Sequence, residues 1–526
     1  MRIGIDFDNT IACYDDIFNE IAIDMQLLPS HRDRDKQQVK ADLLKHPGGM
    51  KNWRRLQGQV YGRFINKATI FPGLGSFLLR CSWSNHEIFI VSHKTEYGHF
   101  DQYKTPLRQA CINWLKNNRF FDSKVFAIPQ RNVHFANSRS EKVSKISELN
   151  LDYMVDDLIE VFMEPSFPRI GKILFSKKSA GDVENISSWY AIADRLLGPR
   201  TDEEIMRFPG CMGVTKEVES VKRIKHGINS EVFCINFKNG KPLALKLYPD
   251  PQIDGRQRLK NEKSAFRVFD KNAPVPKPKA FDHEFNAALF EWIDGVDIEI
   301  PTDNDIDQLC NFISYLKVAT SNYVNSMQLA TEACLSLDEL ITQIEVRIRR
   351  LKKVEHPLLK PFFLDFFDPN FRLAKKHSQI FDQKFSNSQY LQQQNFVLSP
   401  ADFGFHNALR KRDKRVIFLD FEYFGLDDPV KMLADILWHP GMHLDEKQKT
   451  KIVSKVLNLL TGDNNTKDRL FALWPLVGLK WALIVLNDFL SQGILVDQSH
   501  LSIQLSKAQS ILDRLNKTGM YCPYVR

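Results

Sequence analysis

Two aspartates lie two residues apart, directly after the first apolar run of the chain. Asp6 and Asp8 belong to Asp6-Phe7-Asp8-Asn9-Thr10, which follows Ile3-Gly4-Ile5. Two carboxylates at this spacing share a direction only if the chain turns, as it does where a strand ends, and they then need a cation or a proton to offset their repulsion. The alternative is an acidic cap between a strand and a helix. The pair alone leaves both interpretations open.

Further polar residues follow later apolar runs or open helices. Ser92 follows Val91, Lys142 opens a helical pattern, and Asp156-Asp157 end the run Asp152–Val155. Apolar strands separated by helices predict a parallel sheet covered on both faces, with ligands at the carboxyl ends of its strands. The predicted strands are Ile3–Ile5, Ile88–Val91, Val133–Phe135, Tyr153–Val155 and Ile173–Phe175.

These polar groups occur in the order of the four motifs of the haloacid-dehalogenase (HAD) superfamily, which residues 1–195 therefore resemble. The resemblance implies that Asp6 attacks phosphorus and that Asp8 protonates the leaving group and then activates water. It implies that Ser92 and Lys142 hold the phosphoryl oxygens. It places Mg²⁺ among Asp6, Asp8, Asp156 and Asp157, with Asp157 in an outer position.

Two expectations follow for the rest of this region. Lys145 lies one helical turn from Lys142 and is the rival candidate for the phosphate-binding lysine, but we prefer Lys142 because its distance from Asp156 suits the family better. Residues from about 12 to 80 have helical spacing and resemble a small helical cap. Within it, side chains that could read the substrate are Trp53, Arg54, Arg55, Tyr61 and Arg63, although such a charge run is usually solvated.

A second group of residues suggests nucleotide chemistry. Lys246 interrupts the apolar run Leu243–Leu247 and needs an anionic partner, for which Glu262 on the predicted helix Leu259–Phe269 is the natural candidate. A strand lysine paired with a helix glutamate is typical of kinases. Before it, Gly227 and Ser230 form a turn that could let backbone amides approach phosphate, or an ordinary turn.

The segment Ser399–Asn407, followed by the strand Val416–Leu419 and Asp420, carries the decisive pattern. It resembles the catalytic loop and metal-binding aspartate of the aminoglycoside phosphotransferase and choline kinase family, over about residues 220–526. The resemblance implies that Asp402 deprotonates the acceptor hydroxyl, that Asn407 and Asp420 hold Mg²⁺, and that Lys246 grips nucleotide phosphates. It also implies that backbone groups near Glu291 and Ile293 hold the nucleotide base.

The segment departs from that family in one respect. Pro400 stands where the family usually has a histidine, and Ala401 stands where it has a glycine. That histidine supports the loop and does no chemistry in the family. His406 is interpreted as a hydrogen-bonded loop residue. Further along, Asp428-Pro429 and Asp435 fit the family. Three tryptophans could line an acceptor pocket but are more often core residues: Trp438, Trp474 and Trp481.

The predicted fold is an α/β Rossmann-like HAD domain with a small helical cap, followed by an α+β two-lobed protein-kinase-like fold. The HAD-like domain spans 1–198, a linker 199–213, the N-lobe 214–295 and the mostly helical C-lobe 296–526. Charges and chain breakers without apolar periodicity suggest the linker. Asn239-Gly240 predicts a hairpin between two N-lobe strands.

Composition excludes several other classes. The 72 basic and 64 acidic side chains give a net charge of +8 and are mixed along the chain, which does not favour nucleic-acid binding. Eight scattered cysteines without a C-x-x-C pair suggest reduced thiols and a cytoplasmic protein, and the N-terminus shows no signal peptide. Residues Leu470–Leu490 are too polar to span a membrane and suggest a buried helix pair.

Three hypotheses follow. The first is a bifunctional enzyme, a phosphatase for a small phosphorylated metabolite and a phosphotransferase that uses Mg²⁺ with ATP or GTP on a small-molecule hydroxyl. The second is a kinase-like nucleotide-binding regulator in which only the phosphatase is active. The third is that the cap region merely binds a phosphorylated ligand. Two complete carboxylate sets favour the first, because such clusters are costly without a metal. Neither the substrates nor the oligomeric state follow from the sequence.

Overall fold

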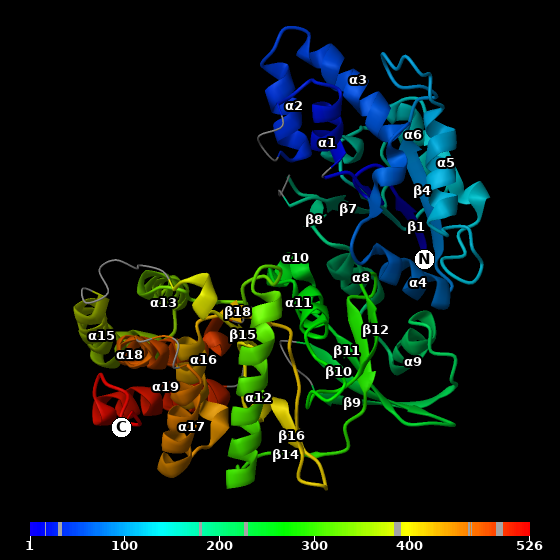
Figure 1. The fold of residues 1–526 in the computed structure, drawn as a ribbon. Helices are drawn as coiled ribbons and strands as arrows, with labels where there is room; N and C mark the ends of the chain where they lie inside the picture. The colour runs from blue at the N-terminus through cyan, green and yellow to red at the C-terminus, as the bar shows by residue number, and fades with distance from the viewer. Residues whose placement is uncertain are drawn as a thin grey trace. The chain divides into compact units, whose positions relative to one another are not determined.

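The computed structural model describes residues 1–15, 17–29, 34–177, 181–225, 230–382, 391–460, 463, 465–490 and 498–525 (Figure 1). Contacts divide the chain into two compact units. The first unit comprises Met1–Lys241, Leu245–Gly255 and Ala280–Ala288, and the second comprises Pro242–Ala244, Arg256–Lys279 and Leu289–Arg526. The predicted boundaries at 198, 213 and 295 remain predictions.

A six-stranded parallel sheet organises the N-terminal part of the first unit. Its order is β5 (Val133–Ala136), β4 (Glu87–His93), β1 (Arg2–Ile5), β6 (Tyr153–Asp156), β7 (Gly171–Phe175) and β8 (Glu184–Ile186). The five predicted strands are confirmed. The sequence prediction missed β8, because its three residues contain one apolar side chain and give no pattern.

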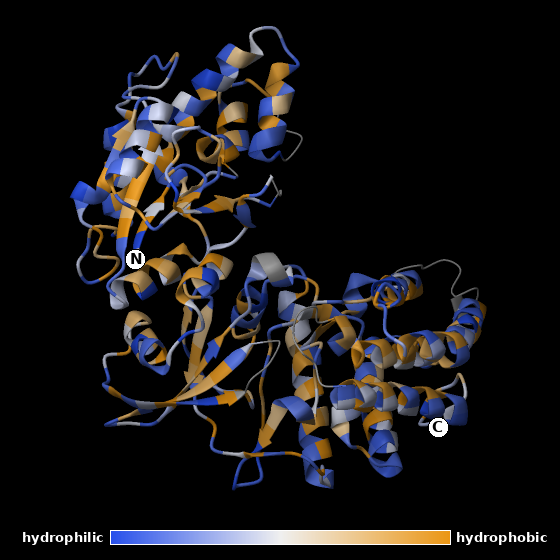
Figure 2. Cartoon of the chain, turned by 180° about the vertical axis from the view of Figure 1, so that it is seen from behind, coloured by the Kyte–Doolittle hydropathy of each residue, from blue (hydrophilic) through white to orange (hydrophobic). Residues whose placement is uncertain are grey.

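Helices cover both faces of this sheet. On one face, α6 (Arg139–Glu148) and α7 (Ile159–Phe162) pack on Phe89, Met154 and Leu174. Phe175 points to the other face, where it contacts Trp189 of α8 (Trp189–Leu197), and Trp189 contacts Phe77 of α4 (Leu74–Trp83). Figure 2 shows the strands in hydrophobic colours and the outer helices with mixed faces. Both faces are therefore buried, as continuous apolar strands predict.

The predicted cap segment contains three short helices that pack on one another: α1 (Ile17–Asp24), α2 (Lys36–Leu44) and α3 (Gly49–Tyr61). They lie between the paired strands β2 (Ala12–Cys13) and β3 (Thr69–Ile70). Phe18 of α1 stacks on Trp53 of α3 with ring centroids 5.2 Å apart. Trp53 is thus part of the interior of this helical group.

The predicted linker 199–213 contains a helix that the sequence did not indicate, α9 (Asp202–Cys211). Thr201 and Glu204 form a capping box that satisfies the first amides of the helix. Ile205 and Phe208 are buried, and Glu204 pairs with Arg80 of α4 at 3.0 Å. The buried apolar residues of the helix are Ile205, Phe208 and Pro209, which are too few to give an apolar period in the sequence.

A five-stranded sheet follows, in the order β12 (Pro278–Asp282), β13 (Ala287–Glu291), β11 (Leu243–Leu247), β10 (Glu231–Phe237) and β9 (Val218–Lys225). β10 and β11 are neighbours, as the Asn239-Gly240 turn between them predicts. The predicted helix over Leu259–Phe269 is present as α11 (Arg258–Ala265).

Most of the second unit is helical. α18 (Thr466–Ile484) packs against α13 (Leu337–Leu351), α15 (Asp368–Asp382), α16 (Pro429–Trp438) and α19 (Gln498–Thr518), and α12 (Asp303–Tyr323) packs against α17 (Glu446–Leu459). The buried helix pair predicted near Leu470–Leu490 is wrong, because α18 is a single helix that continues through Pro475. Packing on four helices outweighs the hydrogen bond that the proline removes.

Short strands carry the polar segments of this unit. β15 (Val397–Ser399) pairs with β18 (Gly425–Asp427), and β16 (Ala408–Arg410) lies between β14 (Val296–Asp297) and β17 (Val416–Phe418). The predicted strand Val416–Leu419 is present as β17, and a further strand, β15, begins at Val397. The two strands belong to different sheets, since a turn at 411–415 joins β17 to β16 instead.

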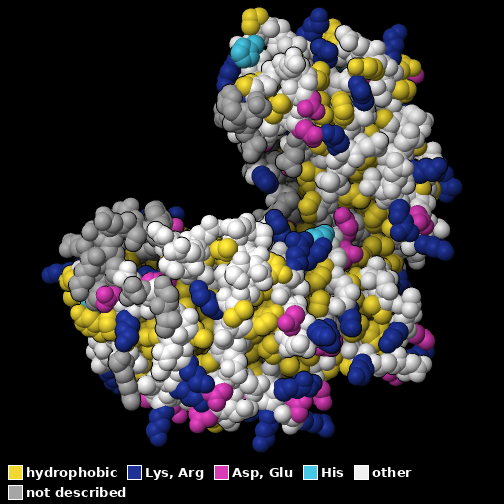
Figure 3. Space-filling model, viewed as in Figure 1, with side chains coloured by type: hydrophobic (Ala, Val, Ile, Leu, Met, Phe, Trp, Pro, Cys, Tyr) yellow, Lys and Arg dark blue, Asp and Glu magenta, His cyan; other side chains and the backbone are white. Residues whose placement is uncertain are grey.

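Three further features concern membrane-spanning helices, disulfides and surface charge. Among the residues described, no helix has both the length and the apolar character needed to cross a bilayer. None of the eight cysteines forms a disulfide. On the face drawn in Figure 3, lysine and arginine side chains are interspersed with acidic ones.

Candidate functional sites

The strand register brings the first carboxylates together. Ile5 of β1 is opposite Val155 of β6, so Asp6 and Asp156 occupy neighbouring positions at the carboxyl edge of the sheet. The Asp6 amide donates to the carbonyl of Val155 at 2.9 Å. Parallel pairing therefore places two acids that are distant in sequence side by side.

Lys142 joins these two acids. Its Nζ lies 2.5 Å from Oδ1 of Asp6 and 2.7 Å from Oδ2 of Asp156, and all three side chains are buried. Lys145, the rival candidate, instead pairs with Glu148 on the surface of α6. Of the two lysines, the structure brings Lys142 to the acids.

The local field at this cluster favours a cation. Burial raises the pKa of Asp6 well above its ordinary value, against the opposing charge of Lys142. Burial and the neighbouring Asp156 raise the pKa of Asp157 to about 7. Carboxylate oxygens of Asp6, Asp156 and Asp157 lie within 4.8 Å of one another. An all-oxygen set of carboxylates, two of them buried and one half-buried, suits Mg²⁺, whose charge would relieve both effects.

Ser92 lies on β4, two residues beyond Ile90, the partner of Ile5 in β1. Its hydroxyl is fully buried and has no hydrogen-bond partner among the described residues. A buried hydroxyl without a partner costs free energy unless a ligand completes it. An oxyanion bound near Asp6 is such a ligand.

Asp8 contacts groups that the sequence did not identify. Lys94, just after β4, places Nζ 2.8 Å from Oδ2 of Asp8, and the Tyr14 hydroxyl donates to Oδ1 at 2.8 Å. Lys94 is buried and also lies 5.1 Å from the ring of Tyr61. Lys36 of α2 places its Nζ 5.8 Å from the centre of the same Tyr61 ring. Two extra cations therefore approach the acids.

The proposed substrate-reading side chains of the cap divide into three groups. Tyr61 contacts the ring of Tyr14 at 5.0 Å and so lies beside Asp8. Trp53 is buried among cap residues. Arg63 lies over the ring of Tyr103, and Arg54 is solvent-exposed while Arg55 is half-buried. The cap residue Lys36 was not predicted from the sequence. Burial opposes its charge, but Tyr61, Asp157 and Asp8 raise its pKa.

The second site starts in the loop after β15. The amide of Ala401 donates to the Ser399 hydroxyl at 3.1 Å, and Ala401 has a positive φ of 65°. The Nδ2 of Asn407 donates to the carbonyl of Asp402 at 3.0 Å and lies 3.3 Å from Oδ2 of Asp402. These bonds fold the loop so that Asp402 and Asn407 are neighbours.

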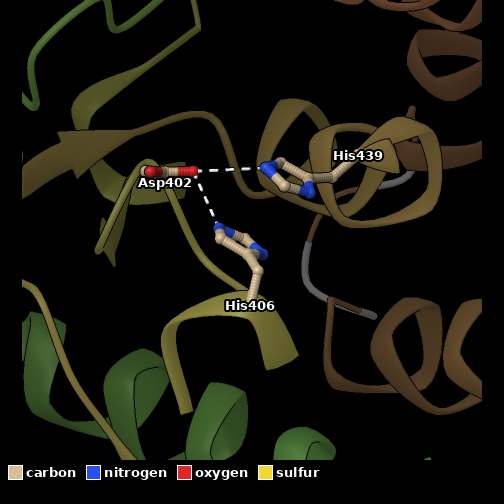
Figure 4. A group of neighbouring side chains, drawn as sticks. All are labelled: Asp402, His406 and His439. Carbon is tan, nitrogen blue, oxygen red and sulfur yellow. Dashed lines mark hydrogen bonds and ion pairs between the residues drawn. The ribbon is translucent and has the colours of Figure 1, made fainter. Parts of the chain in front are cut away.

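Two imidazoles face Asp402 (Figure 4). Nε2 of His406 lies 3.0 Å and Nε2 of His439 3.5 Å from Oδ1 of Asp402. Burial alone would raise the pKa of Asp402, but the hydrogen bonds and charges of the two histidines outweigh it and hold the pKa well below its ordinary value. Burial also lowers the pKa of His439. The hydrogen-bonded loop role predicted for His406 agrees with this contact, whereas His439 was not predicted.

Asp420 lies in a group of three carboxylates. The backbone amide of Leu419 donates to the Asn407 carbonyl at 2.8 Å, which places Asp420 beside Asn407. Oxygens of Glu262, Asp420 and Glu422 lie within 4.8 Å of one another, and Glu422 pairs with Arg258. Since Asn407 uses its amide nitrogen on Asp402, its side-chain oxygen remains as a ligand. Asn407 and Asp420 therefore fit a Mg²⁺ site.

The residues predicted to bind the nucleotide belong to the stretch of chain that contains the five-stranded sheet. Gly227 lies outside the described residues. Ser230 is buried at the start of β10, and Lys246 is buried in β11, with Nζ 4.9 Å from the ring of Tyr248. Glu262 accepts a hydrogen bond from the Phe421 amide at 3.2 Å. The Lys246–Glu262 pairing and the nucleotide-holding roles of Glu291, which ends β13, and Ile293 stay predictions.

Helix α16 anchors several further acids. Asp428 caps its N-terminus and pairs with Arg469 at 2.9 Å. Asp435 accepts from the indole of Trp481 at 2.9 Å and pairs with Lys431. Trp438 and Trp474 are fully buried core residues. The ring of Trp481 lies 4.4 Å from that of His439.

Comparison with known proteins identifies one region. A model of the phosphotransferase enzyme family (APH) matches residues 220–451, the segment that contains Asp402, Asn407 and Asp420. No curated protein matches the sequence. The family match therefore applies to this segment and not to the N-terminal sheet.

The solved structures similar to the chain include two antibiotic phosphotransferases and a choline kinase. One is a thermostable mutant of aminoglycoside phosphotransferase APH(4)-Ia (TM-score 0.41, 14% identity, covering 60% of this chain and 99% of that one). Another is choline kinase LicA from Streptococcus pneumoniae (0.41, 13%, 59% and 99%). A third is spectinomycin phosphotransferase APH(9)-Ia in complex with ADP and spectinomycin (0.44, 13%, 61% and 99%).

Proposed function

We propose that the second candidate site transfers the γ-phosphate of ATP or GTP to a hydroxyl of a small molecule, such as a sugar or an amino-alcohol. The observation that carries the proposal is the contact between Asp402 and Asn407, beside Asp420, within a segment that matches a phosphotransferase family. A base, an amide oxygen and a second carboxylate are the groups that phosphoryl transfer needs in one place.

Each residue has a distinct role in this proposal. Asp402 accepts the hydroxyl proton as the hydroxyl oxygen attacks the γ-phosphorus and the bond to the β-phosphate oxygen breaks. Asn407 and Asp420 would hold Mg²⁺, which neutralises charge on the phosphate oxygens when bound. Lys246 would contact the nucleotide phosphates.

We propose a phosphatase at the first candidate site. The observation that supports it is the buried Ser92 hydroxyl without a partner, on the strand next to the Asp6–Lys142–Asp156 cluster. An oxygen of Asp6 attacks phosphorus, and the bond to the leaving oxygen breaks as Asp8 donates a proton to it. Water, deprotonated by Asp8, then attacks the phosphoryl group and releases Asp6. Ser92 and Lys142 hold its oxygens, and Asp6, Asp156 and Asp157 would hold Mg²⁺.

The two proposals are tested on one preparation of the full chain with Mg²⁺, ATP or GTP and a panel of metabolites, followed by phosphorus NMR. Wild-type protein is expected to remove phosphate from one class of compound and to phosphorylate another. Asp6→Asn is nearly isosteric and should abolish only phosphate release, because the amide cannot form an acyl-phosphate.

Two variants test the transfer site separately. Asp402→Asn should bind nucleotide but lose transfer, since only deprotonation and positioning of the acceptor fail. Asp420→Ala should weaken Mg²⁺-dependent nucleotide binding itself. Wild-type transfer by Asp402→Asn would exclude the kinase proposal and favour a nucleotide-binding regulator. Wild-type phosphate release by Asp6→Asn would exclude the phosphatase.

A further inference from the structure

Pro400 leaves the loop of Asp402 without the histidine that the related family uses for support. The two imidazoles that face Asp402 instead belong to residues that follow it in the chain. His406 lies on the turn just before Asn407, and His439 directly follows α16. Figure 4 shows both rings directed at the same carboxylate.

The tautomer of His439 follows from its second nitrogen. Nδ1 accepts a hydrogen bond from the backbone amide of Gly441 at 3.0 Å. A neutral imidazole carries a single ring hydrogen, so that hydrogen is on Nε2. Nε2 faces Oδ1 of Asp402 at 3.5 Å. His439 is therefore a donor of fixed direction toward the proposed base.

The ring of His439 is held on two further sides. It stacks on His406 with centroids 3.6 Å apart and planes 8° apart. The ring of Trp481 meets it edge-on at 4.4 Å, and the Trp481 indole is itself bonded to Asp435 at 2.9 Å. A ring fixed by a stack, an edge contact and a backbone amide has little freedom to rotate.

His406 supplies the second donor. Its Nε2 lies 3.0 Å from Oδ1 of Asp402, and an ionised carboxylate accepts only, so Nε2 carries a hydrogen. Its Nδ1 is buried and has no hydrogen-bond partner among the described residues. Oδ1 of Asp402 thus accepts a hydrogen bond from His406 and faces the Nε2–H of His439 at 3.5 Å, while Oδ2 accepts from Asn407.

The side chains of Asp402, His406 and His439 lie close enough together to hold a metal ion, but the orientation of the two imidazole rings argues against a metal site. A metal binds imidazole nitrogen in the plane of the ring. At a metal–nitrogen distance of about 2.0–2.1 Å, one ion cannot lie in the planes of two nearly parallel rings whose centroids are 3.6 Å apart. An oxygen 3.0 and 3.5 Å from the two Nε2 atoms lies closer to both ring directions, so the geometry suits two imidazole N–H groups that face one oxygen.

We propose that His406 and His439 are positioning residues that hold the carboxylate of Asp402 for proton abstraction, in place of the histidine absent at position 400. The inference rests on the proposed phosphotransfer. The two imidazole N–H groups that face Oδ1 fix the carboxylate plane, and Oδ2, which also accepts a hydrogen bond from Asn407, faces the acceptor hydroxyl. A base misplaced by rotation loses rate without loss of nucleotide affinity.

The first test does not depend on an acceptor. The full chain is labelled with ¹⁵N-histidine, and nitrogen–hydrogen correlations are recorded at pH 8, where ordinary imidazoles are neutral. The chain has 14 histidines, so the His439 signals are assigned by their loss in His439→Gln. Signals of an Nε2–H tautomer are expected for His439. An Nδ1–H tautomer would overturn the proposal, because Nε2 could then not donate.

The second test measures transfer with the acceptor found by the metabolite screen. His439→Phe keeps a ring but removes the donor, and should lower kcat by about tenfold or more with the KM for MgATP unchanged. His439→Gln keeps a donor and should recover most of that loss. His443→Asn, at an exposed position of the same turn, is the matched control.

The outcomes separate the inference from the proposed function. Full kcat in His439→Phe, or equal losses in the Phe and Gln variants, would overturn the positioning role while Asp402→Asn stays inactive. Transfer at the wild-type rate by Asp402→Asn would instead overturn the kinase proposal. A combined Asp402→Asn and His439→Phe variant should be no slower than Asp402→Asn alone, since His439 acts through Asp402.

Discussion

Lys142 is the residue on which the charge balance of the first site depends. It is buried between Asp6 and Asp156, and burial opposes its charge while the two carboxylates raise its pKa. Without it, two acids in a low-dielectric environment would repel each other and any bound phosphate. Lys145 lies on the same helix but pairs with the exposed Glu148.

Replacing these two lysines should therefore have unequal effects. We expect Lys142→Ala to reduce phosphatase kcat by about a hundredfold, equivalent to roughly 3 kcal/mol of transition-state stabilisation, and Lys145→Ala to change it by less than about twofold. Steady-state phosphate release measures both. Equal effects, or the reverse order, would assign the third motif to the wrong helical turn.

Single functional residues can be predicted from the sequence where a reaction needs two groups at a fixed spacing along the chain. Asp6 with Asp8 and Asp402 with Asn407 are such pairs. The sequence does not predict partners that only folding brings near. Lys94 reaches Asp8 from a position 86 residues away, and His439 reaches Asp402 from the end of α16. A lone lysine or histidine in such places has no local pattern to distinguish it.

Helix α9 shows why an element can escape sequence analysis. Its interior side is reduced to Ile205 and Phe208, and its first turn consists of acids. A capping box and the ion pair from Glu204 to Arg80, whose side chain is 1% exposed, stabilise the helix in addition to the burial of these two side chains. The parallel strands were predictable, by contrast, because burial on both faces leaves continuous apolar runs.

Two substitutions separate the cap of α9 from its ion pair. Glu204→Gln keeps an acceptor for the Thr201 amide but leaves Arg80 without a countercharge, and should lower the free energy of unfolding by about 2 kcal/mol. Thr201→Ala removes only the other half of the capping box and should cost about 1 kcal/mol. Urea unfolding compares them. A larger cost for Thr201→Ala would show that the cap, and not the ion pair, holds the helix.

Glu284, in the turn between β12 and β13, makes stability depend on pH. Burial and the charge of Asp282 raise its pKa from 4.5 to about 7, against a hydrogen bond from the Gly75 amide. Between these values the folded chain binds a proton that the unfolded chain has lost. This contribution to stability is therefore present at low pH and is lost as pH rises from about 4.5 to about 7.

Glu284→Gln should remove that dependence. The variant is expected to gain about 1 to 2 kcal/mol over wild type at pH 8, with allowance for partial exposure, and little at pH 4.5. Thermal unfolding across this range is the measurement, with the exposed Glu203→Gln as a control. A gain that is the same at both pH values would mean that Glu284 is ionised throughout.

For the whole molecule, contacts group the chain into two compact units, each built from several separate stretches of sequence. The first unit continues past position 198 through Lys241 and includes 280–288, so it holds both the parallel sheet and strands of the five-stranded sheet. Phe208 of α9 lies 6.0 Å from the ring of Trp83 and 4.9 Å from that of Phe285, all within this unit. Composition suggested a boundary here because breakers and charges dominate its sequence.

A comparison of two truncated chains tests where the N-terminal fold ends. Residues 1–213 retain α9, whereas residues 1–198 lose it, which uncovers Trp83 and leaves Arg80 buried without Glu204. Each buried side chain of Ile205 or Phe208 contributes about 1.5 to 3 kcal/mol, and the unpaired guanidinium adds a further cost. We therefore expect the longer chain to unfold at a clearly higher urea concentration and the shorter one to aggregate more readily. The carboxylates of the first site are the same in both, so Mg²⁺ should stabilise each chain similarly if it remains folded. Equal midpoints would mean that α9 is dispensable for the parallel sheet, and that the predicted boundary at 198 marks the end of an independently stable domain.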